Sequence, residues 1–476
     1  MPTHATLDPA TARWIPWVVA IAFFMQSLDG TILNTALPAM ARDLAEDPLR
    51  MQSVVIAYML TVALLIPASG WVADRFGIKR VFMTAIGIFT VGSLLCAVSF
   101  TLPMLVTARI LQGLGGALLL PVGRLVVLRA YPRSELVRIL SFITVPGLLG
   151  PLIGPTMGGW MVEYLTWHWI FLINLPVGIL GCWAVHKLLP ELPGGERTRF
   201  DGLGFGLFGA AMVLITIAME GLGELHLPHL RVMLLLFAGM ACLAAYWLRA
   251  VHVDAPLFAA SLFRTRSFAV GILGNLFARL GSGALPFLVP LLLQVGMGYS
   301  PSLAGMSMIP LAAAAMVAKP LAGRLIGRFG YRKVLTTNTV ALGVMLASLG
   351  LVDAQTPYTL LMIHLAVLGA INSMQFTAMN TVTLIDLGDQ EASSGNSLLA
   401  VVAQLSMSLG VACAGALLGG FESSVVSEEG VESILGAFHW TFLTIGLMAM
   451  FAATIFVQLS PEVGRRAVRP PPGPDA

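Results

Sequence analysis

The sequence has little charge. Only 11% of its 476 residues are Asp, Glu, Lys or Arg, whereas about a quarter of the residues of a soluble globular domain are charged. Hydrophobic residues make up 57% of the chain, and its mean hydropathy is +0.86. This composition excludes an ordinary soluble enzyme and indicates a membrane protein.

Cysteine is also scarce, and the sequence lacks the close pairs of cysteine that hold metals or carry out redox reactions. The four cysteines lie far apart, each within an apolar stretch, and are Cys96, Cys182, Cys242 and Cys413. Zinc and redox sites need cysteines at short, regular spacings. We therefore expect no metal site and no cofactor, and interpret these cysteines as small hydrophobic residues.

Long polar segments are missing as well. The longest connection between apolar runs surrounds "LPELPGGERTRFDG", residues 189–202, which leaves no room for a soluble catalytic domain. A helix needs about 20 apolar residues to cross the bilayer, whereas barrel strands alternate over about ten residues. The apolar runs are long and continuous, so the sequence predicts an all-α membrane protein with fourteen transmembrane helices.

The basic residues predict the orientation of the chain. If the N-terminus lies inside, twenty of the 27 Lys and Arg residues fall in cytoplasmic segments and four fall within predicted spans. Only Arg42, Arg50 and Arg231 fall on the opposite side of the membrane. Such an excess of cytoplasmic Lys and Arg sets topology in membrane proteins. We predict that both termini are cytoplasmic, and the net charge of +3 needs no nucleic acid partner to explain it.

One sequence occurs twice. "GWVADRFGIKRV" (70–81) follows the second predicted span, and "GRLIGRFGYRKV" (323–334) follows the tenth. Spans 1–6 and 9–14 are thus predicted to be two copies of a six-helix unit, an arrangement in which transporters rock one half against the other. The predicted parts are a cytoplasmic N-terminus (1–13), an N-terminal bundle (14–189), a linker with two extra helices (190–267), a C-terminal bundle (268–459) and a disordered cytoplasmic tail (460–476).

Four motifs, in order and at corresponding spans, carry a family resemblance. They are "SLDGTILNTALP" (27–38), "GWVADRFGIKR" (70–80), "ARILQGLGGA" (108–117) and "GLLGPLIGPTMGG" (147–159), and "WHWIFLINLPVG" (167–178) also matches except that the family often has Arg at His168. With them the sequence resembles the fourteen-span drug:proton antiporters of the major facilitator superfamily. The resemblance implies a proton-coupled exporter of small molecules in the bacterial inner membrane, acting in multidrug efflux and antibiotic resistance, with the proton gradient as its energy source.

The first copy of the repeated sequence is a candidate conformational latch. The residues expected to form it are Gly70, Asp74, Arg75, Gly77 and Arg80. Gly70 is expected to allow close helix approach and Gly77 to make the turn. By analogy with the family fold, Asp74 would face the N-terminus of span 13 near Ser393 and Ser394, where the helix dipole favours an anion. The second copy has Gly327 in place of Asp74, so we expect an asymmetric pair; alternatively, both copies are basic loops that only set orientation.

The motif in span 5 concentrates small residues on one helix face. Gly150, Gly154 and Gly158 recur every four residues beside Pro151 and Pro155, and small residues let helices approach closely. The full candidate motif is Gly147, Gly150, Pro151, Gly154, Pro155, Gly158 and Gly159. Ordinary tight packing is one interpretation; the resemblance adds that this helix seals against span 10 and restricts leak in exporters.

Ionisable residues within spans are the candidates for proton coupling. Charge near the bilayer centre costs at least about 2.5–3.5 kcal/mol, so it is retained for a reason. Asp29 is the acid that lies well inside a predicted span, and it could bind and release a proton or form a structural pair. Arg109 lies in the span-4 motif, which the resemblance connects with proton transfer, and it could equally be a structural cation.

Polar residues in other spans are candidates for a substrate cavity. They are Gln26, Asn34, Asn275, Arg279, Ser282, Asn372, Gln375 and Asn380. Asn275 and Ser282 lie one turn on either side of Arg279 and could form a polar stripe with it. The three polar residues of span 12, in "INSMQFTAMN", could bind a ligand or hold helices together.

Three functions are compatible with these residues. The first is a proton-coupled multidrug exporter whose partners are the lipid bilayer, protons and a small-molecule substrate, and for which a monomer is sufficient. The second is an exporter of an anionic metabolite or metal chelate such as a tricarboxylate, because the deep cations Arg109, Arg279 and Lys319 outnumber Asp29. The third is a membrane sensor or embedded enzyme, for which we find no nucleotide loop, metal cluster or nucleophile with a base.

Overall fold

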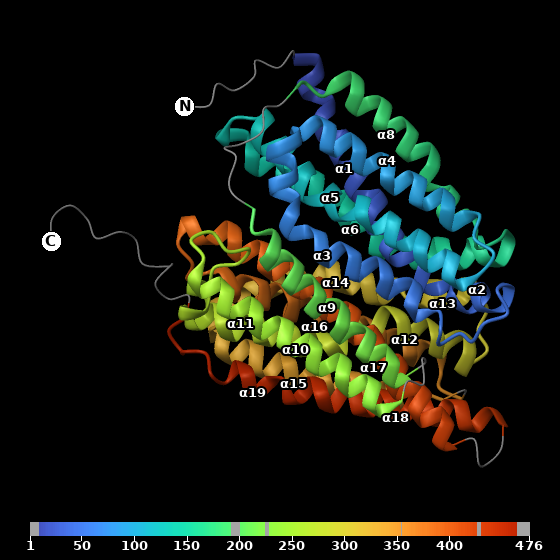
Figure 1. Cartoon of the computed structure of the whole chain (residues 1–476). Helices are drawn as coiled ribbons and strands as arrows, with labels where there is room; N and C mark the ends of the chain where they lie inside the picture. Colours follow the sequence, from blue (N-terminus) through green and yellow to red (C-terminus); the bar gives the residue numbers. More distant parts are fainter. Residues whose placement is uncertain (1–8, 192–199, 224–227, 354, 426–429, 464–476) are drawn as a thin grey trace. The chain divides into compact units, whose positions relative to one another are not determined.

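A computed structural model describes residues 9–191, 200–223, 228–353, 355–425 and 430–463. These residues form helices and no strand (Figure 1), and fourteen of the helical stretches are long and apolar enough to cross a membrane. The predicted all-α membrane fold with fourteen spans is therefore confirmed. Of the predicted terminal segments, residues 1–8 and 464–476 lie outside the described residues.

Packing divides the chain into two compact units, and the first contains residues up to Phe200 together with Pro286–Ile309. Its elements are α1 (Pro9–Ile32), η1 (Leu33–Thr35), α2 (Leu37–Asp43), α3 (Gln52–Phe76), α4 (Ile78–Ala97), α5 (Leu102–Ala130), α6 (Arg133–Tyr164), α7 (Trp169–Leu172), α8 (Asn174–Leu188), most of α12 (Leu285–Leu291), the π-helical turn η3 (Leu292–Gly296) and α13 (Pro301–Ser307). Within this unit α4 packs beside α5 and α8, and α1 packs along α6.

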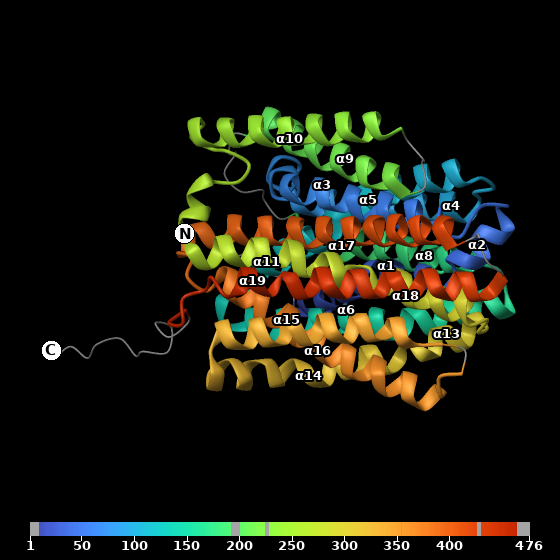
Figure 2. The same ribbon diagram turned by 90° about the horizontal axis from the view of Figure 1, so that it is seen from below.

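The second unit contains Asp201–Leu285 and the chain from Pro310 onward. Its elements are α9 (Gly202–Gly223), α10 (His229–His252), η2 (Ala260–Arg264), α11 (Arg266–Gly283), α14 (Ile309–Phe329), α15 (Tyr331–Ser348), η4 (Leu349–Leu351), α16 (Tyr358–Leu384), α17 (Asp389–Val425), α18 (Gly430–Phe451) and α19 (Ala453–Phe456). Figure 2 shows α15 beside α16 and α18, and the inserted helices α9 and α10 pack on each other, with α9 also against α17. This division by packing differs from the predicted bundles, which stay a prediction.

The repeated sequence produces the same turn in both units. Gly77 separates α3 from α4 with φ +89°, and Gly330 separates α14 from α15 with φ +78°. Residues with a Cβ rarely adopt this left-handed backbone, so glycine ends one helix and starts the next. The predicted turn at Gly77 is present, and the second copy repeats it.

The tenth span extends beyond its predicted end. The sequence predicts this span over residues 301–321, but α14 continues to Phe329. Lys319 lies just before the predicted end and Arg324 just after it, and both side chains are exposed. Long basic side chains can remain in a helix near the membrane surface while their charged ends reach water, so the positive-φ glycine rather than the first charge ends the helix.

Candidate functional site

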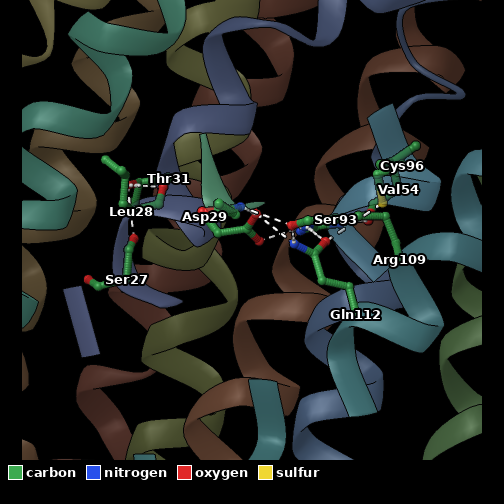
Figure 3. Close-up of polar contacts among 10 residues, drawn as sticks. Ser27, Leu28, Asp29, Thr31, Val54, Ser93, Cys96, Arg109 and Gln112 are labelled. Carbon is green, nitrogen blue, oxygen red and sulfur yellow. Dashed lines mark hydrogen bonds and ion pairs between the residues drawn. The ribbon is translucent and has the colours of Figure 1, made fainter. Parts of the chain in front are cut away.

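A buried ion pair lies at the centre of the first unit. Asp29 of α1 and Arg109 of α5 are each 1% exposed, and Arg109 Nη1 donates to Asp29 Oδ2 at 2.7 Å. Figure 3 shows the two side chains brought together with their polar neighbours. A charge removed from water needs both a counter-charge and hydrogen bonds. The two sequence-predicted coupling residues therefore meet, although they lie 80 positions apart.

Amides and a hydroxyl complete the environment of this pair. Asp29 Oδ1 accepts hydrogen bonds from Gln112 Nε2 at 2.8 Å and from Asn174 Nδ2 at 3.0 Å. Gln112 Oε1 accepts a second hydrogen bond from Arg109 at 2.7 Å, and Ser93 Oγ accepts from both Gln112 and Asn174. Three helices thus meet at the carboxylate, α1, α5 and α8, and α4 joins the network through Ser93.

Glycines of the span-4 motif bring α5 close enough for these contacts. A Cβ at Gly113 would lie 2.8 Å from Thr61 Cβ of α3, and one at Gly115 would lie 2.5 Å from the backbone nitrogen of Phe89 in α4. A side chain at either position would force its helices apart. The motif therefore serves two purposes: it supplies Arg109, and it supplies the close packing that buries it.

The Arg109 side chain also contacts α3. Its Nε donates to the Val54 carbonyl at 3.3 Å, and its guanidinium lies 4.2 Å from the centre of the Tyr58 ring, an arrangement that favours a cation. In the described part of the chain, the buried Tyr58 hydroxyl and Gln26 Oε1 have no hydrogen-bond partner. Gln26 lies three residues before Asp29 in α1, so unused polar atoms remain near the pair.

A second buried cation lies in the other unit. Arg279 of α11 is 6% exposed, and its Nε and Nη2 donate to Asn275 Oδ1 and Asn380 Oδ1, both at 3.0 Å. Its guanidinium lies 4.1 Å from the centre of the Phe376 ring. Among the described residues, no carboxylate lies within ion-pair distance of Arg279. The unit therefore holds a buried positive charge with only neutral partners.

The other predicted cavity residues have hydrogen-bond partners of their own or none that the structure describes. Gln375 is buried and bonds to Asn338 and Thr339 of α15, which favours the interpretation that it holds helices together. Ser282 donates to the backbone of its own helix at Ala278. Asn34 likewise donates to the backbone at Thr31, and Asn372 Oδ1 has no partner among the described residues.

The motif of span 5 packs mainly against α1. A Cβ at Gly150 would lie 2.7 Å from the Leu28 backbone nitrogen, and Cβ atoms at Gly154 and Gly158 would meet Thr31 and Ile32. Pro151 has no N–H for the Gly147 carbonyl, and Ser27 Oγ donates to that carbonyl instead, at 2.6 Å. The glycine face and the hydroxyls of α1 thus form one tight contact; Figure 3 shows the α1 side chains Ser27 and Thr31.

The same helix α6 also meets the start of span 10. A Cβ at Gly159 would collide with the Pro301 carbonyl, and Thr156 donates to the Gly305 carbonyl at 3.3 Å. Glu163 accepts a hydrogen bond from the Ser302 backbone nitrogen at 2.9 Å. The helix thus contacts α13 as the resemblance implies, but Gly159 lies at this contact, whereas the Gly150, Gly154 and Gly158 face lies against α1.

In the candidate latch, Asp74 of α3 pairs with Arg129 of α5 at 3.1 Å, with both side chains partly exposed. The expected contact of Asp74 with Ser393 and Ser394 stays a prediction. A Cβ at Gly70 would have no described neighbour of the first unit within 4 Å, so the expected close helix approach there stays a prediction. The Arg75 guanidinium lies 5.5 Å from the centre of the Trp71 ring.

Sequence reasoning did not single out Gln112, Asn174, Ser93 and Tyr58 as parts of the site. Gln112 and Asn174 lie within the quoted stretches "ARILQGLGGA" and "WHWIFLINLPVG", so a polar amide in a predicted span was the available signal. Ser93 and Tyr58 gave no such signal in the sequence, because serine and tyrosine are common in spans. Within the described residues no cluster of three or more His, Cys, Asp or Glu side chains could hold a metal.

Comparisons with known proteins agree with this architecture. The family model described as Major Facilitator Superfamily matches residues 19–411 and 271–475. A Pectobacterium atrosepticum protein named "Putative multidrug resistance protein MdtD" is 46% identical over 96% of this chain and 97% of its own length. The protein of the same name from Cronobacter sakazakii is 47% identical over 97% of both chains.

Solved structures show the same fold at low sequence identity. A bacterial homologue of the human lysosomal transporter Spinster, in an inward-facing and occupied conformation, matches with a TM-score of 0.70 and 14% identity over 94% of this chain and 97% of its own. A D-xylose-proton symporter matches with a TM-score of 0.66 and 15% identity over 94% and 98%.

Proposed function

Because this chain belongs to the major facilitator superfamily and is a multi-pass membrane transporter, we propose that it is a proton-coupled antiporter that exports drugs of several kinds. Its relatives' names as multidrug resistance proteins support the substrate class. We further propose that it works as a monomer in the inner membrane with both termini cytoplasmic, and that the proton gradient replaces any cofactor as the energy source.

The observation that carries the proposal is the environment of Asp29. Its carboxylate is buried, accepts hydrogen bonds from Arg109, Gln112 and Asn174, and so connects α1, α5 and α8. Among these side chains the carboxylate is the acid, and we propose that it carries the coupling proton. Its protonation state therefore controls a junction on which the packing of the unit depends.

Protonation of Asp29 would act by competing with Arg109. A proton on the carboxylate removes the charge that attracts the guanidinium, and a buried cation without its partner is unfavourable by about 3–5 kcal/mol. Arg109 would keep the Val54 carbonyl and the Tyr58 ring as neutral partners, and the loss of its counter-charge would favour a rearrangement of the helices around it. Proton binding and helix rearrangement are coupled in this way, as alternating access requires.

The contact of α6 with α1 and α13 supports the direction of transport. Exchange without leak requires close helix packing wherever protons and substrate could otherwise pass independently. Gly150, Gly154 and Gly158 of α6 provide such packing, together with the hydrogen bond from Ser27 to the Gly147 carbonyl. The family resemblance links this motif with exporters.

Everted membrane vesicles with an acid interior test the proposal. A lipophilic cationic drug added outside should enter in exchange for lumenal protons, so the lumenal pH rises. Asp29→Asn should reduce this rise at least tenfold, whereas Asp353→Asn, a control at an exposed loop acid bonded to Thr356, should leave it intact. Equal exchange by the Asp29→Asn protein would exclude the coupling role.

A second candidate function is favoured by Arg279. A buried guanidinium without a carboxylate among the described residues would gain from an anionic substrate, and Arg recognises carboxylates with two parallel hydrogen bonds. Arg109 contributes less to this argument than the sequence suggested, because Asp29 neutralises it. The cargo would then be an anionic metabolite or its metal chelate.

The same vesicles separate the two candidates. Citrate, as the tricarboxylate probe, replaces the cationic drug, and Arg279→Gln replaces Asp29→Asn as the test variant. Proton release driven by citrate and lost in Arg279→Gln supports the anion exporter. Release driven only by the cationic drug supports multidrug export.

A further inference from the structure

A large cavity lies in the second unit, beside the second copy of the repeated sequence. Its volume is about 1270 Å³, and it lies between the end of α14, the start of α15, the end of α16 and the segment after α19. Figure 2 shows α15 and α16 side by side in this unit. By the predicted topology, this end of the unit faces the cytoplasm.

Three cations line this cavity. Arg328, Arg332 and Lys333 all belong to the second repeat, and within the described chain none of them forms an ion pair. Two acids are neighbours of lining residues in the sequence: Asp386 follows Ile385, and Glu462 lies between Pro461 and Val463. Neither acid lines the cavity itself. The cavity wall is therefore positive.

The comparison of the two repeats explains the missing acid. In the first copy, Asp74 supplies a carboxylate at the fifth position and pairs with Arg129. In the second copy this position is Gly327, which lines the cavity, and a Cβ there would have no described neighbour within 4 Å. The second copy thus retains the basic residues, loses the acid and has open space in its place.

The remaining wall is partly apolar. Ile326, Phe329, Ile385, Val457 and Val463 line it together with hydroxyl-bearing threonines. Arg and Lys bind phosphate through charge-assisted hydrogen bonds, and basic pockets between transmembrane helices on the cytoplasmic side bind anionic headgroups. A positive pocket with apolar walls matches a molecule that has a phosphate at one end and hydrocarbon at the other.

We propose that this cavity is a phosphate-binding site, and that its occupant is the headgroup of an anionic phospholipid of the inner leaflet. Arg328, Arg332 and Lys333 hold the phosphate, and the apolar side chains contact the glycerol and the first methylenes of the acyl chains. The site shares no residue with the Asp29–Arg109 pair or with the contacts of Arg279, and does not depend on the identity of the cargo.

The test uses Gly327→Asp, which restores the acid of the first repeat. A carboxylate in the open space should pair with the cations and repel a phosphate, lowering affinity at least tenfold. Gly327→Asn is the matched control, since it has the same shape without the charge and should bind within about threefold of wild type. A second pair is Arg332→Gln, expected to weaken binding, and Arg324→Gln, which removes a cation of the same repeat outside the cavity lining.

The full-length protein, purified in detergent, is titrated with dihexanoyl phosphatidylglycerol, dihexanoyl phosphatidylcholine and inorganic phosphate, and binding is followed by the shift in unfolding temperature. A shift with phosphatidylglycerol alone that is lost in Gly327→Asp supports the phospholipid site. A shift with inorganic phosphate alone and the same variant pattern supports the phosphate site but overturns the lipid source. No shift with either, or equal affinity in Gly327→Asp and Gly327→Asn, overturns the proposal.

Discussion

Arg109 and Asp29 form an ion pair at 2.7 Å in which each side chain is 1% exposed. Removing one member leaves the other as an uncompensated buried charge, whereas removing both leaves neutral groups of similar size. We expect Arg109→Gln to destabilise the protein by about 3–5 kcal/mol, and Asp29→Asn/Arg109→Gln to recover most of that loss. Thermal unfolding in detergent measures both.

The double variant also separates folding from function. It should insert and unfold much like wild type but fail to exchange protons for substrate, because its junction no longer has a carboxylate to carry the proton. A double variant as unstable as Arg109→Gln would show that the pair does not act as a unit. One that transports normally would show that the pair is structural, which was the alternative interpretation of both residues.

Ser27 is predicted to stabilise the proline-containing part of α6. Its hydroxyl donates to the Gly147 carbonyl, which Pro151 leaves without its usual helical donor. A buried acceptor without a partner costs about 1–3 kcal/mol, so Ser27→Ala should lower stability by that amount in the same unfolding assay. Ser53→Ala, which removes an exposed hydroxyl bonded to Arg50, should change it little; equal effects would argue against this role for Ser27.

Two glycines of α6 should respond differently to a methyl group. At Gly158 a Cβ would collide with the Ile32 carbonyl and lie 2.6 Å from Thr35 Oγ1, whereas at Gly147 its nearest described neighbour is Phe23 Cβ at 3.9 Å. Overpacking costs about 1–3 kcal/mol. Gly158→Ala should therefore separate α6 from α1 and increase proton leak in vesicles without substrate.

Gly147→Ala is the matched control in the same helix and should leave leak unchanged. Leak that stays at the wild-type rate in both variants would mean that the close α1–α6 contact is not a permeability barrier.

Much of the fold could be predicted because it depends on local hydropathy. Each span needs a long apolar run, and the turn at Gly77 follows from a glycine between two such runs. The Asp29–Arg109 pair could be predicted only as two separate candidates, because their contact depends on how α1 and α5 pack over 80 positions of sequence. The spacing of Gly150, Gly154 and Gly158 in the sequence likewise did not show whether their helix face meets α1 or span 10.

Span 12 illustrates the same limit. Gln375 and Asn380 lie in one polar stretch, yet Gln375 bonds to Asn338 and Thr339 while Asn380 bonds to Arg279. Their different partners follow from which helix each face of α16 meets, and hydropathy does not contain that information.

Asp74 provides a further test, because its pair with Arg129 is partly exposed. Exposed pairs contribute about 0–1 kcal/mol, so Asp74→Asn should change the unfolding free energy little. If the latch role is right, transport should nevertheless fall at least tenfold while membrane insertion stays normal. Unchanged transport would favour the alternative that the repeat only sets orientation, and Asp353→Asn again serves as the control.

Arg279 should behave unlike Arg109 when neutralised. Its hydrogen-bond partners are the neutral amides Asn275 and Asn380. Arg279→Gln therefore removes a buried positive charge that has no counter-charge, and it leaves no unpaired negative charge behind among the described residues. Its stability should stay within about 1 kcal/mol of wild type, because the loss of two charge-assisted hydrogen bonds is offset by the removal of a buried charge that has no counter-charge. If Arg279 binds an anionic substrate, citrate-driven exchange should fall at least tenfold in a protein that unfolds normally. Retained exchange with citrate would exclude that role, and a destabilisation as large as that of Arg109→Gln would indicate a structural counter-charge instead.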